Sequence, residues 1–209
     1  MSIAIKLASL WGQGGAGAAT FVGGGGGYSN GTFSVSYSGA QAGDLCVIWK
    51  THQGVDVTGY TAQAMPARTP WDGFNGALYY RALTSGDIST GSVSVNTAGG
   101  CITAYGIYRG PTTAILQTTA KAASATGVTV SGFVKNGSES GVLAGCFHQG
   151  SSAPTGPTVT NTRESVAGTV FGSLRLSDYD PPSSYPTAGN VSWTFGATTN
   201  GEAWLAALR

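Results

Sequence analysis

Apolar and polar residues alternate along several short stretches of this chain, and that period of two restricts the fold more than any other feature. In the stretch TFSVSYS, Phe33, Val35 and Tyr37 fall on one face of an extended strand and serines on the other. The same alternation recurs in residues 92–96, 127–131 and 191–195. Asn-Gly and Gly-Gly turn signals separate such stretches, and helical periodicity is nearly absent. The pattern therefore predicts an all-β fold.

An internal repeat divides most of the chain into two similar halves. The matching stretches are residues 31–54 with 126–150, residues 76–83 with 172–179, and residues 91–109 with 189–209. Half of such a chain would be marginally stable alone. We therefore predict one domain over residues 31–209, an antiparallel two-sheet, jelly-roll-like sandwich whose halves, residues 31–109 and 126–209, are joined by a loop near residues 110–125.

Residues 12–30 fall outside the repeat and contain five consecutive glycines, Gly23 to Gly27. Glycine is costly to order, but it lets a backbone pass close to another surface. We predict that residues 1–30, with the strand-like stretch of residues 3–11, form a Gly-rich attachment arm. The alternative is a loop tucked into its own sandwich. The candidate assembly contacts of the arm are its apolar anchors, Trp11, Phe21, Val22 and Tyr28.

Charge is scarce, with a formal net charge of +1 and only 9% charged residues, against about 25% in typical soluble domains. Without a Lys/Arg cluster, nucleic-acid binding is not expected. No continuous apolar run is long enough to predict membrane insertion. Three cysteines without a Cys-x-x-Cys pattern predict neither a disulfide framework nor a metal site. A surface this poor in charge suggests that much of it faces other protein.

Two motif matches and two histidines do not amount to a catalytic or cofactor site. The GQGGAG stretch lacks the following helix that a dinucleotide fingerprint needs, and GYSNG lacks the strand-to-helix turn of a nucleophile elbow. His52 and His148 stand at matching repeat positions and are best interpreted as loop structure. Asp178 and Asp180 are too few for a calcium site. We therefore predict a non-enzymatic protein with no catalytic, cofactor-binding or metal-binding residues.

Several aromatic residues lie in predicted loops, where they could contact a sugar or a protein. These candidate exposed aromatics are Tyr60, Trp71, Tyr179 and Tyr185. The alternative is that they pack down as local anchors. By contrast, we expect Trp49, Trp193 and Trp204 in the core, because they lie in strand patterns.

The phrases AGDLCVIWKTHQG, GALYYRALTSGD, SVSVNTAGGCITAYGIYRG and EAWLAALR resemble those of a set of bacteriophage β-sandwich virion proteins, found as head decorations, head fibres or tail fibres. The resemblance covers residues 31–209 and leaves the Gly-rich arm outside. It implies a virion protein assembled in the host cytoplasm, a homo-oligomer that contacts capsid, portal-adjacent or tail proteins. A head decoration or head-fibre subunit is the first expectation. The alternatives are a tail-fibre or tail-tip receptor-binding module that contacts a host surface glycan, and a carbohydrate-binding or glycan-degrading domain.

Overall fold

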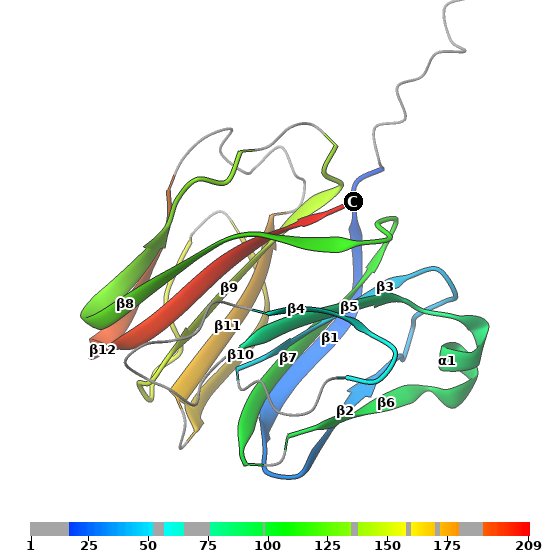
Figure 1. Ribbon diagram of the computed structural model, residues 1–209, viewed down its shortest axis with the longest axis horizontal. Helices are drawn as coiled ribbons and strands as arrows, with labels where there is room; N and C mark the ends of the chain where they lie inside the picture. Colours follow the sequence, from blue (N-terminus) through cyan, green and yellow to red (C-terminus); the bar gives the residue numbers. More distant parts are fainter. Residues whose placement is uncertain are drawn as a thin grey trace, which may run out of the picture.

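A computed structural model describes residues 17–51, 57–64, 76–97, 99–134, 138–157, 160–169, 172–179 and 190–209. Two antiparallel five-stranded sheets dominate it, and the first half of the chain lies at the right of Figure 1 and the second half at the left. The first sheet has the order β1 (Thr20–Ser29), β7 (Cys101–Arg109), β3 (Leu45–Lys50), β5 (Ala77–Ala82), β4 (Thr61–Ala64). The second has the order β10 (Asn161–Thr169), β11 (Gly172–Tyr179), β9 (Gly141–His148), β12 (Val191–Leu208), β8 (Ala114–Val130).

The remaining elements are a strand pair and a short helix in the first half. Strand β2 (Thr32–Ser36) pairs with β6 (Ser92–Asn96), as β12 pairs with the end of β8 in the second half. Helix α1 (Ser85–Thr90) starts at a capping box between Thr84 and Asp87, and it ends at Gly91 in a left-handed conformation. The predicted all-β, two-sheet antiparallel sandwich is confirmed, and its jelly-roll connectivity stays a prediction.

The two sheets have the same strand order, which is the structural form of the sequence repeat. From β1 the order is β1-β7-β3-β5-β4, and from β8 it is β8-β12-β9-β11-β10. The registers agree as well. In the outer strand pairs, Phe33 lies opposite Val95 as Val128 lies opposite Trp193. Val35 likewise lies opposite Val93 as Val130 lies opposite Val191. This agreement places Phe33 with Val128 and Val93 with Val191, the correspondence that the repeat predicts.

Two predicted boundaries do not hold. Residues 114–122 belong to strand β8 rather than to a joining loop, and residues 20–29 form strand β1 rather than part of an external arm. In strand order β1 and the start of β8 are counterparts, so the repeat begins earlier than its apolar signal suggests. The Gly run is neither a loop nor a free arm. It is the outermost strand of the first sheet, paired with β7 along its length.

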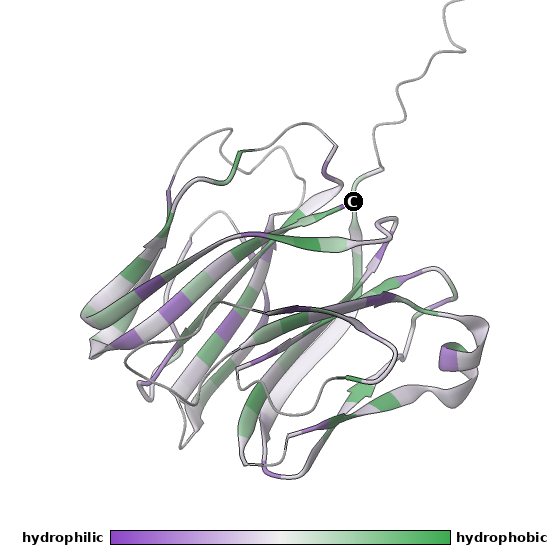
Figure 2. Cartoon of the chain, viewed as in Figure 1, coloured by the Kyte–Doolittle hydropathy of each residue, from purple (hydrophilic) through white to green (hydrophobic). Residues whose placement is uncertain are grey.

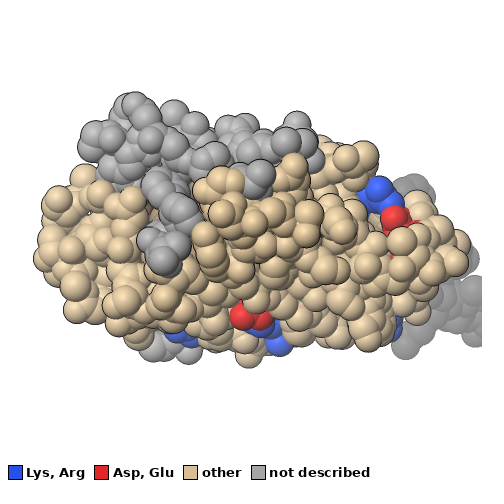
Figure 3. Space-filling model, turned by 90° about the horizontal axis from the view of Figure 1, so that it is seen from below, with Lys and Arg blue, Asp and Glu red and all other residues tan. Residues whose placement is uncertain are grey.

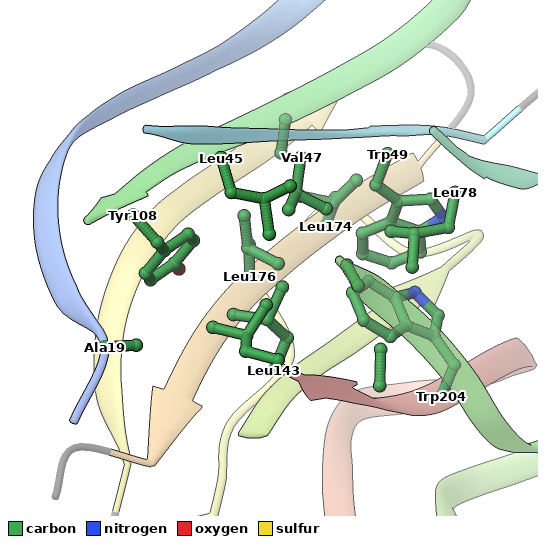
Figure 4. Close-up of a cluster of buried hydrophobic side chains, with 14 of the residues drawn as sticks. Ala19, Leu45, Val47, Trp49, Leu78, Tyr108, Leu143, Leu174, Leu176 and Trp204 are labelled. Atoms are coloured by element: carbon green, nitrogen blue, oxygen red, sulfur yellow. The ribbon is translucent and has the colours of Figure 1, made fainter. Parts of the chain in front are cut away.

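The hydrophobic core lies in three layers. The inner faces of the two sheets pack against each other around Leu45, Trp49, Leu143 and Trp204 (Figure 4). The outer face of the first sheet is covered by β2 and β6, and that of the second by the folded-over parts of β8 and β12, which include Trp193. Figure 2 shows hydrophobic residues along these strands, with β1 pale over its glycines. Trp49, Trp193 and Trp204 are buried, as predicted, whereas Trp71 lies outside the described residues.

At the centre of the interface between the two sheets, a position that holds a large residue in one half holds a small residue in the other. Trp49 lies opposite Ala104 in the first sheet, whereas in the second the small residue Gly145 lies opposite Trp204. The two indole rings meet edge to face, with centroids 5.1 Å apart at 87° (Figure 4). A Cβ on Gly145 would come within 2.2 Å of the Trp204 ring. The sheets therefore fit together because each half keeps one position small where the other is large.

A side chain also links the two sheets at the edge where β4 meets β8. Gln63 of β4 donates through Nε2 to the carbonyl of Ala114, and its Oε1 accepts from the Leu116 backbone N–H at 2.7 Å. Gln63 thus satisfies both a donor and an acceptor of the β8 main chain, as a neighbouring strand would.

Replacing Gln63 by glutamate should lower the free energy of unfolding by about 1–2 kcal/mol, because a carboxylate has no N–H for the Ala114 carbonyl. The matched control is Gln117→Glu, the same change on an exposed position of β8, with an expected effect within about 0.5 kcal/mol. Urea titration measures both variants. Equal effects would show that Gln63 does not hold the β8 edge.

Candidate functional site

The densest group of reactive side chains lies on the outer face of the first sheet. The Tyr37 and Tyr60 hydroxyls are 2.9 Å apart, and Tyr60 also bonds the Cys46 thiol. The Arg81 guanidinium lies 5.5 Å from the centre of the Tyr60 ring and pairs with Asp87. Burial raises the pKa of the Cys46 thiol to about 12 and also raises the pKa of Tyr60. Since a reactive cysteine needs a lowered pKa, this group is built for packing rather than nucleophilic chemistry.

Asp87 ties this group to helix α1 and gives it a pH dependence. Partial burial would raise its pKa, but bonds from Arg81 and Thr84 outweigh burial and lower the pKa of Asp87 to about 2. That value lies below the ordinary aspartate pKa of about 3.9. The stabilisation is therefore complete above about pH 5 and is lost as the pH falls toward 2.

We expect the wild-type chain to lose about 1–2 kcal/mol of stability through this carboxyl between pH 5 and pH 2, after allowance for partial solvent screening. Asp87→Asn should be less stable at pH 7 and should approach the wild type at pH 2. Urea titrations across this pH range measure the difference. A constant difference at every pH would contradict the assignment.

A second charged group lies where β1 meets β10. Arg163 Nε donates to the buried Asp178 Oδ2 at 2.7 Å, and the guanidinium lies 4.3 Å from the centre of the Phe21 ring. Phe21 in turn packs edge to face on Tyr108, with centroids 5.6 Å apart. Burial raises the pKa of Asp178, although the ion pair with Arg163 opposes this shift. Asp178 therefore serves as a structural partner of Arg163.

His148 also has a structural role, at the end of β9. Its Nδ1 accepts from the Gly150 N–H at 3.1 Å, and its Nε2 bonds the Ser152 carbonyl. The ring stacks on Phe195, with centroids 4.6 Å apart. Burial lowers the pKa of His148 despite the Ser152 bond, so the neutral ring is favoured. His52 lies outside the described residues.

The predicted exposed aromatics do not form a platform in the described part of the chain. Tyr60 is half-buried in the group around Cys46, and Tyr179 is 1% exposed, so both predictions of exposure are wrong. Strand β11 continues to Tyr179 and points it into the outer core of the second sheet, which its loop-like sequence context concealed. Trp71 and Tyr185 lie outside the described residues.

The four candidate assembly contacts do not form one surface in the described part of the chain. Phe21 packs on the inner core and Val22 on the outer core of the first sheet, so both anchor β1 to its own sandwich. Tyr28 is 39% exposed and is one of two large hydrophobic residues classed as exposed in the described part of the chain. Trp11 lies outside the described residues.

Side chains of neighbouring strands cover both faces of the Gly run. A Cβ on Gly25 or Gly27 would come within 3.3 Å of the Tyr105 or Phe33 ring on one face. A Cβ on Gly26 would come within 2.5 Å of Glu164 of β10, and one on Gly24 within 2.5 Å of the Tyr105 carbonyl. Glycine is therefore required because the space that side chains would fill is already occupied.

What remains open is the main-chain edge of β1. Within the described residues β1 is a terminal strand of its sheet and pairs with β7 only, so the main chain of its Gly run, Gly23–Gly27, lies at the sheet edge. Sequence reasoning placed the assembly element at the Gly run but assigned it to side-chain anchors rather than to the strand edge. The sequence carries no signal for this strand, because its glycines have no side chains that could alternate.

We also searched the described residues for metal sites, pockets and membrane-spanning helices. These residues contain no cluster of metal-ligating side chains and no detected pocket. No helix among them has the length and apolar character needed to cross a membrane. Figure 3 shows a broad face on which only a few charged side chains appear.

No protein-family model matches this chain, and no curated protein or solved structure is detectably similar to it. What the chain does is therefore inferred from its own residues and geometry.

Proposed function

We propose that this chain is a non-enzymatic structural protein of a bacteriophage virion, in first place a head decoration or head-fibre subunit. The observation that carries the proposal is the edge position of β1, a ten-residue strand that pairs only with β7 among the strands the structure describes. A main-chain edge of this kind recognises another strand and suits protein assembly. The sequence resemblance to phage virion proteins supplies the setting, and the low content of charge suits a surface packed against other protein.

The partners in this proposal are capsid, portal-adjacent or tail proteins and further copies of the chain. Because β1 is a strand of the sandwich, the proposed assembly element comprises residues 1–16 and the edge of β1, and it joins copies of the chain to one another.

The carboxylates support a non-enzymatic role. Four carboxylates in the described residues are each paired with an arginine, and all four are buried or half-buried. The pairs are Asp44 with Arg109, Asp87 with Arg81, Glu139 with Arg209, and Asp178 with Arg163. A glycan-degrading enzyme needs two carboxylates that face one cleft, free to exchange protons with substrate. Carboxylates held by arginine serve stability instead.

A tail-fibre or tail-tip module that binds a host glycan is the second candidate. Trp71 and Tyr185 remain its candidate contacts, since Tyr60 and Tyr179 are buried to different degrees. A glycan array with the intact chain separates this candidate from the first. Binding that Trp71→Ala abolishes would favour the receptor-binding role over the decoration role.

The test of the first candidate is sedimentation with phage particles assembled without this protein. We expect the full chain to pellet with particles at a saturating, reproducible copy number and to stay in the supernatant without them. Failure to bind particles of the phage that encodes the chain would contradict the proposal.

A further inference from the structure

The four outermost strands of the two sheets differ in how their free edges are protected. Strand β4 has only four residues, β8 carries Lys121, and β10 carries Arg163 and Glu164. Short length and charged side chains are common devices against pairing with another chain. Strand β1 has ten residues, and no Lys, Arg, Asp, Glu or Pro occurs from Gly17 to Ser29. Its one such device is a register shift between Phe21 and Gly23.

The repeat provides an internal comparison for this edge. Leu78 lies opposite Trp49 as Leu176 lies opposite Gly145, so strand register pairs these two leucines, two residues away from the sequence alignment of residues 76–83 with 172–179. Gln63 lies opposite Leu78 as Glu164 lies opposite Leu176, and Gln63 and Glu164 are therefore counterparts. Gln63 bonds both a carbonyl and an N–H of β8. Glu164 instead accepts from the Ser165 N–H at 3.1 Å and lays its aliphatic part over Gly26. Since a carboxylate has no hydrogen to donate, Glu164 cannot close the β1 edge as Gln63 closes the β8 edge.

The chain itself contains a segment with the pattern of an added strand. Residues 3–10, IAIKLASL, place Ile3, Ile5 and Leu7 on one face of an extended strand. Six residues, 11–16, separate residue 10 from Gly17, and they can span up to about 20 Å when extended. The segment is thus long enough to pair along most of β1 and is tethered close to it.

The start of β1 is held beside the C-terminal strand. The Ala19 N–H donates to the Ser140 carbonyl at 2.8 Å, and the Ser140 N–H donates to the Leu208 carbonyl at 2.8 Å. The chain therefore reaches β1 beside the C-terminal strand, at the end of the sandwich where Figure 1 marks the C-terminus. Pairing of residues 3–10 with their own β1 would need a reversal of the chain between the two segments, whereas a strand from a neighbouring copy needs none.

We propose that residues 3–10 of one copy add as a strand to the open edge of β1 in a second copy, and that the exchange is reciprocal. Two copies that each give and receive one strand form a closed dimer. The main chain of the Gly run supplies the hydrogen bonds along the edge of β1.

The first test is the mass of the full chain and of a chain lacking residues 1–16, measured by light scattering after gel filtration. We expect the full chain at twice the 21.0 kDa of one chain and the shortened chain as a folded monomer. A monomeric full chain, or a shortened chain that still dimerises, would overturn the proposal.

The second test distinguishes exchange between copies from pairing within one chain. Chains carrying Ile5→Cys are mixed with chains carrying Gly23→Cys, at a position where a Cβ meets nothing closer than 3.8 Å, and are oxidised. The native cysteines are buried. The same mixture is repeated with Ile3→Cys and with Leu7→Cys in place of Ile5→Cys, and we expect a mixed disulfide dimer with Gly23→Cys for at least one of the three. As the control, Ser138→Cys replaces Gly23→Cys, and we expect no mixed disulfide dimer. If only a chain carrying both substitutions forms the bond, and forms it internally, the segment pairs with its own β1 and the exchange is excluded.

Discussion

Replacing Trp204 by alanine is expected to lower the free energy of unfolding by about 3–5 kcal/mol, because the indole fills the centre of the interface between the two sheets. Trp49→Ala should have a similar effect, since the two rings are in contact. Their double variant should lose less than the sum, because either truncation already opens the same space. Urea denaturation of the four proteins measures these effects. Strictly additive losses would show that the rings do not depend on each other.

Gly145 offers a sharper test of the same interface. Gly145→Ala should destabilise the wild-type chain by about 1–3 kcal/mol, because the new Cβ would strike the Trp204 ring. In the Trp204→Ala background the same change should be neutral or stabilising, because alanine then only reduces the freedom of the unfolded chain. If Gly145→Ala lowers the free energy of unfolding of the wild-type chain but not that of the Trp204→Ala chain, position 145 must be small because Trp204 is large. The same destabilisation in both would contradict it.

Substitutions in the Gly run are expected to cause the second largest loss in the free energy of unfolding. Gly24→Ala and Gly26→Ala are each expected to cost about 1–3 kcal/mol, since each Cβ would meet atoms of β7 or β10 at 2.5 Å. Gly24 is the stricter case because the obstacle is a backbone carbonyl, which cannot rotate away. Thermal or urea unfolding measures the loss.

Gly23→Ala is the matched control for these variants. At Gly23 a Cβ would meet nothing closer than 3.8 Å, and the expected change is within about 0.5 kcal/mol. If all three substitutions were equally mild, the Gly run would not be required by packing against β7 and β10.

The sequence predicted those strands in which side chains alternate. In β2, Val35 is buried and its serine neighbours are exposed, and in β12 Val191 and Trp193 are buried on either side of exposed Ser192. Period-two patterns identify such strands because each side chain chooses between core and solvent. The repeat carried the prediction further, since the two sheets have the same strand order.

Strands without such alternation could not be recognised from their own residues. Glycines in β1 have no side chains to alternate, and the start of β8 mixes alanine and threonine without a consistent apolar face. Both form strands because a partner strand, β7 or β12, supplies the hydrogen bonds. Tertiary pairing thus decided these segments, as it commonly does where local preference is weak. For the same reason the sequence placed the candidate site at the Gly run but predicted an external arm with side-chain anchors, whereas the structure has a strand at the edge of the first sheet.

The account's central claim is that this chain assembles with other protein through the open edge of β1. Electron cryomicroscopy of particles that carry the chain tests it most directly. The account predicts continuous density for an added strand beside Gly23–Gly27, traced to residues 3–10 of a neighbouring copy. A β1 edge exposed to solvent, with the particle contacting another face of the sandwich, would contradict it.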